Sequence, residues 1–120
     1  MTEHRYSKEE RRQQLRELAA TLPRLVATVS ALPQLRHLNG RYELALDEVG
    51  ELLRNGFDQA QLSELGRSIP DAFARHKEWV PPLERTLDGQ LREPDWFVEL
   101  ENSLQPVLRT ARILCELGYY

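Results

Sequence analysis

One stripe of apolar residues in the first third of the chain constrains the fold more than any other feature. Its members alternate three and four positions apart: Leu15, Leu18, Leu22, Leu25, Val29 and Leu32. This spacing returns side chains to one side of an α-helix at every turn, so it predicts a helix with one buried face. Ser7 and Glu10 form a capping-box pattern that predicts the helix start. Pro23 lacks an amide hydrogen and predicts either a kink or a break; we favour the break, which gives helices over about 8–20 and 22–32.

Two later stretches repeat the same helical spacing. The first predicts a helix over roughly 41–55, after a turn at Asn39-Gly40 and before Asn55-Gly56; its apolar members are Tyr42, Ala45, Leu46, Val49, Leu52 and Leu53. The second predicts a long C-terminal helix that Asp95 opens and Gly118 ends, bent or broken at Pro106; its apolar members are Phe97, Leu100, Leu104, Val107, Ala111 and Leu114. We interpret the interior Gly50 as a point of close helix packing.

The stretch between these helices predicts shorter ones. Asp58 caps a helix that runs to Leu65 and ends at Gly66. Ser68 caps the next, whose inner face is Ile69, Phe73, His76 and Val80. A further helix carries Leu83, Leu87 and Leu91 on one face and ends at Gly89 or Pro94. We recognise no strand-like alternation. The sequence therefore predicts an all-α fold, a compact bundle of four to five main helices with short Pro- and Gly-marked corners, in one domain over 1–120 with a frayed 1–6.

Charge and composition narrow the classes of function. The chain has 120 residues, of which 41% are hydrophobic, and a formal net charge of −3, which argues against a general nucleic-acid binder. Residues 1–41 carry eight Lys/Arg against four Asp/Glu, whereas the remainder carries eight against fifteen. This asymmetry fits either a partner-binding surface or an attraction between the two halves, and we favour the second.

Cysteine usage and apolar runs bear on the compartment. Cys115 is the one cysteine, so the chain forms no internal disulfide, and no Cys/His cluster has zinc-ligand spacing. Its apolar neighbours favour a packed thiol over a reactive one. The N-terminus lacks an apolar signal core, and no apolar run reaches membrane-spanning length. We therefore expect a cytoplasmic protein without a membrane segment.

The stretch Asn55–Phe73 has the outline of a helix-turn-helix, with Gly66 as the turn glycine. Leu62 stands where a small residue is required, and Arg67 stands where an apolar one is expected. Pro70 and Asp71 would begin the recognition helix, where proline offers no donor and aspartate repels phosphate. A plain helical corner is the better interpretation.

Catalytic and metal-binding groups are sparse. Glu43, Asp47 and Glu51 line one helix face and could hold a metal or supply a base, but no Glu-x-x-His accompanies them. We favour a solvated face, or one paired with the row Lys8, Arg12 and Arg16, and predict no metal and no cofactor. His76 could act with this acidic row, and no catalytic motif supports it. A small ligand-binding or catalytic bundle stays an alternative, as does nucleic-acid binding through the Arg-rich first helix.

The aromatic residues give the most suggestive signal. Five large aromatic residues lie in the acidic final third of the chain: Trp79, Trp96, Phe97, Tyr119 and Tyr120. Aromatic side chains rimmed by charge, here including Glu93 and Asp95, are common at protein interfaces. The other interpretation is that the tryptophans brace the proline corners. We expect a protein-binding accessory, adaptor or neutralising partner whose partner is a protein with a basic surface, or a second copy bound through an amphipathic helix.

Overall fold

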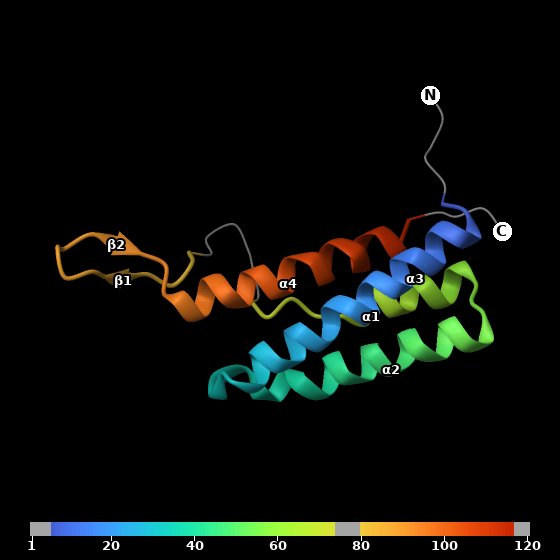
Figure 1. Ribbon diagram of the computed structural model, residues 1–120, viewed down its shortest axis with the longest axis horizontal. Helices are drawn as coiled ribbons and strands as arrows, with labels where there is room; N and C mark the ends of the chain where they lie inside the picture. The colour runs from blue at the N-terminus through green and yellow to red at the C-terminus, as the bar shows by residue number, and fades with distance from the viewer. Residues whose placement is uncertain (1–5, 74–79, 117–120) are drawn as a thin grey trace, which may run out of the picture.

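The computed structural model describes residues 6–73 and 80–116 of the chain (Figure 1). The described elements are, in chain order, α1 (Lys8–Ser30), the 3-10 helix η1 (Pro33–Leu38), α2 (Asn39–Asn55), α3 (Gln59–Ser68), β1 (Glu84–Arg85), β2 (Leu91–Arg92) and α4 (Asp95–Leu114). Of the described residues, 72% are helical, with four α-helices packed against one another, and the predicted all-α bundle is confirmed. Helix α1 packs between α2 and α4, while α3 packs mainly on α4.

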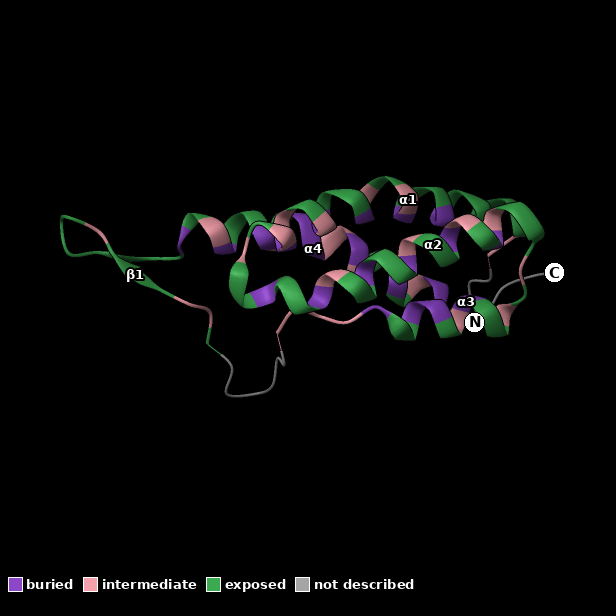
Figure 2. Cartoon of the chain, turned by 90° about the horizontal axis from the view of Figure 1, so that it is seen from below, coloured by how far each residue is buried: buried purple, intermediate pink, exposed green. Residues whose placement is uncertain are grey.

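The core follows the predicted helical stripes. All of the α1 stripe from Leu15 to Val29 is fully buried, and the buried residues of α2 and α4 repeat the same spacing. Figure 2 shows these buried residues on the inner sides of the helices, with exposed residues outside. Burial of leucine and valine stabilises the bundle by about 1.5–3 kcal/mol for each side chain.

Helix α1 runs without interruption through Pro23, so the predicted break into two helices is wrong. Pro23 lies on the exposed side of α1, where water can hydrate the carbonyl that loses its helical partner. The buried leucines before and after it pack on α2 and α4, and this packing outweighs the local cost of the proline. Helix α4 is likewise continuous through Pro106.

Helix α2 begins at Asn39, directly after η1, so the predicted turn at Asn39-Gly40 is wrong. It ends as predicted, because Gly56 adopts a φ of 89° that favours glycine. The predicted close packing at Gly50 is also wrong. A Cβ placed there meets only the Arg54 side chain of the same helix.

Helix α3 continues past Gly66, which is buried inside the helix and does not form a turn. A Cβ on Gly66 would stand 2.4 Å from the Ala111 carbonyl oxygen and 2.7 Å from the Cys115 Sγ. Gly66 therefore lets α3 approach α4 closely. A helix-turn-helix at this position is excluded because its turn glycine lies within a helix.

The predicted helix after Ser68 is wrong over Ile69–Phe73, and residues 74–79 lie outside the described part. Ile69 is extended, with φ −85° and ψ 111°, because the ring of the following Pro70 excludes the helical conformation. Pro70, which we predicted to lie in the first turn of a helix, therefore ends α3 and directs the chain away from it.

The predicted helix through Leu83, Leu87 and Leu91 is wrong as well, because this stretch is a β-hairpin. Strands β1 and β2 pair antiparallel, with Glu84 opposite Arg92. The loop is closed by the Thr86 amide, which donates to the Gln90 carbonyl at 2.7 Å, and by Gly89, whose amide donates to the Thr86 carbonyl at 2.9 Å. Gly89 has a φ of 86°, as a three-residue hairpin loop requires. Figure 1 shows the hairpin projecting from the start of α4, away from the bundle.

Candidate protein-binding surface

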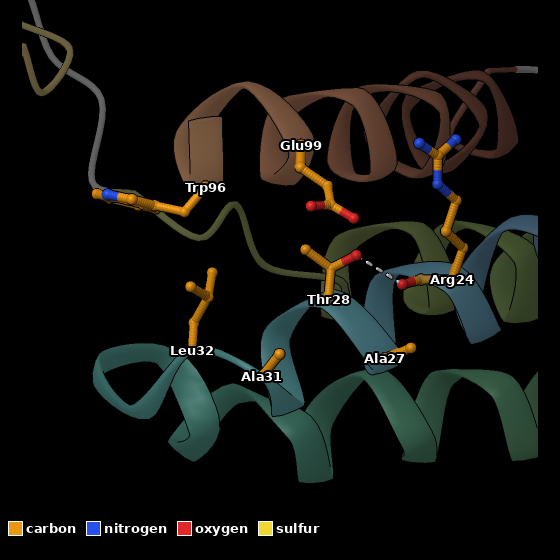
Figure 3. A pocket seen from close by; sticks show the side chains of 7 residues that line it. All are labelled: Arg24, Ala27, Thr28, Ala31, Leu32, Trp96 and Glu99. Carbon is orange, nitrogen blue, oxygen red and sulfur yellow. Dashed lines mark hydrogen bonds between the residues drawn. The ribbon is translucent and has the colours of Figure 1, made fainter. Parts of the chain in front are cut away.

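A groove lies where the last turns of α1 meet the first turns of α4. It encloses about 260 Å³ and is lined by Arg24, Ala27, Thr28, Ala31, Leu32, Trp96 and Glu99. Figure 3 shows the Trp96 ring above Leu32 at one end of this groove, with Glu99 and Arg24 toward the other. We call this feature the Trp96 groove.

The Trp96 groove exists because α1 presents small side chains to α4 at this point. Ala27 and Ala31 are four residues apart and therefore lie on one side of α1. The Thr28 hydroxyl donates to the Arg24 carbonyl at 2.9 Å, so its polar group is already satisfied within α1. These small side chains form the floor of the groove, and they leave the space beside Trp96 unfilled.

The wall of the groove is held by an aromatic stack. The Trp96 ring meets the Phe97 ring edge to face, with centroids 6.0 Å apart. Phe97 is only 2% exposed, and its ring lies 5.5 Å from that of Phe73. Edge-to-face contacts of this kind restrict ring motion. Trp96 therefore offers a half-buried, fixed surface to a ligand.

Both signs of charge border the groove. Arg24 and Glu99 are exposed, and neither forms an ion pair with any other described residue. Glu93 and Asp95 are exposed at the start of α4, as the predicted acidic rim requires. The Arg92 guanidinium lies 3.9 Å from Asp95 and neutralises part of that rim. The charge at the surface is thus mixed, with an acidic excess on α4.

The two strands of the hairpin have different side chains on their two faces. Side chains alternate between the faces of a ribbon, so Glu84 and Arg92 share one face, where their side chains form an ion pair at 2.8 Å. The opposite face carries Leu91 with its cross-strand partner Arg85. Leu83, just before β1, Leu87, in the loop, and Leu91 are 50%, 110% and 61% exposed. We call these three residues the hairpin leucines. No other part of the described chain covers them.

Exposed apolar surface is concentrated at this end of the molecule. Among the described residues, six large hydrophobic side chains are exposed: Leu44, Val80, Leu83, Leu87, Leu91 and Val98. Five of the six fall within 80–98: Val80 and Leu83 before β1, Leu87 and Leu91 in the hairpin, and Val98 in the first turn of α4. Single exposed apolar residues are ordinary, whereas a cluster of them marks an interaction surface or an aggregation hazard.

Of the predicted surface residues, Trp96 lines the groove, and Glu93 and Asp95 are exposed just before it in the sequence. Phe97 does not belong to the surface, because it is buried beneath Trp96, and that prediction is corrected. Trp79, Tyr119 and Tyr120 lie outside the described residues. Sequence reasoning missed the hairpin leucines. Asp88-Gly89, between residues that favour an extended chain, was the hairpin signal that could have revealed them.

The alternative acidic site finds no support in the described residues. The part of the chain that the structure describes contains no group of three His, Cys, Asp or Glu residues able to hold a metal. Glu51 pairs with Arg54 of its own helix at 3.2 Å, and His76 lies outside the described range. Lys8 lines the same shallow hollow as Glu48 and Glu51, which agrees with a charge-balanced, solvated face.

The basic row of the first helix is also broken up. Arg12 and Arg16 both pair with Glu9, at 3.3 and 3.5 Å. Arg11 is fully buried, and its guanidinium donates to the Ile113 carbonyl at 2.9 Å and to the Glu116 carbonyl. The signal for this burial was present, because Arg11 lies four residues before Leu15 and extends the apolar stripe by one turn.

Cys115 differs from its predicted packing, because it is an exposed residue. Its thiol lies 3.5 Å from the Ala111 carbonyl oxygen and 3.6 Å from that of Ser63. It lies at the end of the bundle opposite to the Trp96 groove, where α4 finishes.

No protein-family model matches this sequence, and comparisons with curated proteins and with solved structures returned no match. None of the described helices combines the length and the apolar character needed to cross a bilayer. The role of the chain must therefore be argued from the chemistry of its own surface.

Proposed function

We propose that this chain is a protein-binding accessory or adaptor that binds its partner at the end of the bundle where α4 starts. The proposal rests on one observation: five of the exposed large apolar side chains fall within 80–98, the segment that leads into the first turn of α4, where Trp96 lines the groove. Burial of such side chains is the main source of affinity in protein association. In the monomer, the surface that these side chains leave exposed to water contributes nothing to the free energy of folding.

The side chains of the surface indicate which side chains a partner needs. The groove accepts an apolar side chain against Trp96, in keeping with the prominence of tryptophan among residues that dominate binding energy. Glu99 lines the groove, and Glu93 and Asp95 add negative charge just before Trp96 in the chain. A complementary segment carries an apolar side chain next to a basic one, and the charges set its orientation more than its affinity.

Affinity capture from a native cell lysate, with mass spectrometry, tests the proposal. The groove variants are Trp96→Ala and Glu99→Lys. The matched controls are Leu44→Ala and Glu43→Lys, which alter an exposed apolar residue and an exposed acid on α2. We expect the wild type and the controls to retain the same specific protein, and the groove variants to lose it. Equal retention by all five chains, or specific retention by none, contradicts the proposal.

A further inference from the structure

We infer that the Trp96 groove receives the hairpin tip of a second copy of this chain, with Leu87 seated in the groove and the contact made reciprocally. This inference rests on the proposed function, because it names the partner of the same surface. It draws on three features of the molecule: a preformed tip, a groove of matching size and charge, and their placement at one end.

The hairpin tip projects from the bundle and ends in an apolar side chain. Leu87 is 110% exposed, so its side chain is as open to solvent as in an extended chain. The loop around it is fixed by the hydrogen bonds between Thr86, Gly89 and Gln90. A preformed loop loses little conformational entropy on binding. Leu87 therefore has the properties of an anchor residue.

Two opposite charges flank Leu87. The Arg85 guanidinium donates to the Gly89 carbonyl at 3.0 Å, which keeps it close to the tip. Hydrogen bonds from the Thr86 hydroxyl and the Gln90 amide lower the pKa of the Asp88 carboxyl, so it is ionised at neutral pH. The tip thus presents a leucine between a fixed cation and a fixed anion.

The Trp96 groove complements this tip in size and in charge. Its volume of about 260 Å³ is below the roughly 300–1,000 Å³ of small-molecule sites and suits one branched aliphatic side chain. Figure 3 shows Glu99 of α4 and Arg24 of α1 on the side of the groove away from its Trp96–Leu32 end. Glu99 can meet Arg85 of the tip, and Arg24 can meet Asp88. Neither groove charge has an ion-pair partner among the described residues.

The placement of tip and groove favours reciprocal exchange. Both lie at the end of the molecule where α4 starts, and Figure 1 shows the hairpin directed away from its own bundle. The tip therefore does not fill the groove of its own chain. When two chains each seat their tip in the other, the contact is related by a two-fold axis and closes at a dimer. The closed arrangement covers the hairpin leucines of both copies.

Sedimentation velocity of the purified full chain, from micromolar to sub-millimolar concentration, tests the inference. The variant Leu87→Asp replaces the anchor, and Leu44→Asp is its control, because both leucines are exposed and only one lies at the tip. We expect a concentration-dependent dimer for the wild type and for the control. For Leu87→Asp we expect the dissociation constant to rise by at least about tenfold, as for a central anchor.

A charge exchange tests the orientation. Arg85→Glu and Glu99→Arg should each weaken the dimer, and the double variant should recover most of the wild-type dissociation constant, because the pair is restored with its signs reversed. Circular dichroism on every variant confirms that the helices are intact. No recovery in the double variant would overturn this docking.

A wild-type chain that is monomeric at every concentration, or a dimer that Leu87→Asp leaves unchanged, overturns the inference. The two proposals fail separately. If the chain is monomeric but Trp96→Ala still loses a captured protein, the second copy is not the partner and the proposed function stands. If the chain dimerises through Leu87 but captures nothing else, the dimer stands and binding to a different protein is ruled out.

Discussion

The two ends of the α1–α4 pair are built in opposite ways. At one end, which we call the closed end, the start of α1 meets the end of α4 through the buried Arg11. At the other, the open end, the Trp96 groove and the hairpin leave apolar side chains in water. The two antiparallel helices therefore have hydrogen-bonded polar groups at one end and exposed apolar side chains at the other. The comparison separates the part that stabilises the fold from the part available for binding.

At the closed end, side chains of other elements donate hydrogen bonds to the carbonyls at the end of α4. The last carbonyls of α4 have no partner within the helix. The Arg11 guanidinium donates to two carbonyls at this end, and the Gln59 amide donates to a third, that of Leu114, at 2.9 Å. The positive charge also complements the negative end of the α4 dipole. Tyr6 covers the guanidinium, whose Cζ lies 4.7 Å from the ring centroid.

The largest effect is expected when Arg11 is removed. Arg11→Ala removes the hydrogen bonds that a fully buried guanidinium donates to Gln14, to Gln59 and to the Ile113 and Glu116 carbonyls, and it opens a cavity. It should therefore lower the free energy of unfolding by about 3 kcal/mol. Arg12→Ala is the control, because its exposed pair with Glu9 contributes less than about 1 kcal/mol. Urea denaturation measures both. Equal, small losses would mean that Arg11 does not hold the closed end together.

Gly66 gives the next largest effect, again at the closed end. Gly66→Ala forces a Cβ against the Ala111 carbonyl, so α3 and α4 must move apart, at a cost of about 2 kcal/mol. Gly50→Ala is the matched control. There the Cβ meets only the flexible Arg54 side chain, and the better helix propensity of alanine should stabilise α2 by up to about 1 kcal/mol. Thermal unfolding should shift in opposite directions, and a parallel shift would contradict the close approach of α3.

Tyr42 tests the region between the two ends. Its hydroxyl donates to the Pro70 carbonyl at 2.8 Å, so Tyr42→Phe should cost about 1 kcal/mol at neutral pH. Burial, together with the nearby Asp71 charge, raises the pKa of Tyr42 to about 12. Because the folded pKa exceeds the unfolded value near 10, the contribution of Tyr42 is complete below pH 10 and is lost as the pH rises toward 12.

The measurement for Tyr42 is urea denaturation at a series of alkaline pH values. The wild type should lose its advantage over Tyr42→Phe between pH 10 and about 12, since phenylalanine does not titrate. A difference between the two proteins that stays constant over this range would show that the phenol is not held in its neutral form by the fold.

The smallest effect on stability is expected at the open end. Leu87→Asp should change the free energy of unfolding of the monomer by less than about 0.5 kcal/mol, because Leu87 contacts little of its own chain. Dilute protein, at concentrations where the wild type is monomeric, gives the relevant denaturation curve. A loss comparable with that of Arg11→Ala would mean that the hairpin supports the bundle, and the contrast between the two ends would fail.

Much of the bundle could be predicted from the sequence. The leucines of the first stripe are buried as expected, and the capping boxes at Ser7 and Asp58 start their helices where the pattern places them. These features are local, because a helix aligns residues three and four apart whatever it packs against. Of the predicted protein-binding surface, Glu93 and Asp95 are exposed and Trp96 is half-buried, and its role in binding stays a prediction.

The hairpin could not be separated from a helix by its leucine spacing. Leu83, Leu87 and Leu91 are four residues apart, which aligns them on a helix. In the hairpin, Leu91 lies on the face opposite to Glu84 and Arg92, while Leu83 precedes β1 and Leu87 lies in the loop. The leucine spacing alone therefore does not distinguish the helix from the hairpin. Here the Asp88-Gly89 loop decides in favour of the hairpin, because glycine reaches the required positive φ without strain.

The sequence by itself determined the helical character of the chain and most of its buried face, because both depend on neighbours within a few residues. The tertiary structure decided the continuity of α1 through Pro23, the burial of Arg11 and the role of Gly66. Each of these depends on a second helix: packing that offsets a lost hydrogen bond, carbonyls that accept from a guanidinium, and a backbone too close for a Cβ. Such contacts join residues far apart in the chain, and no local spacing encodes them.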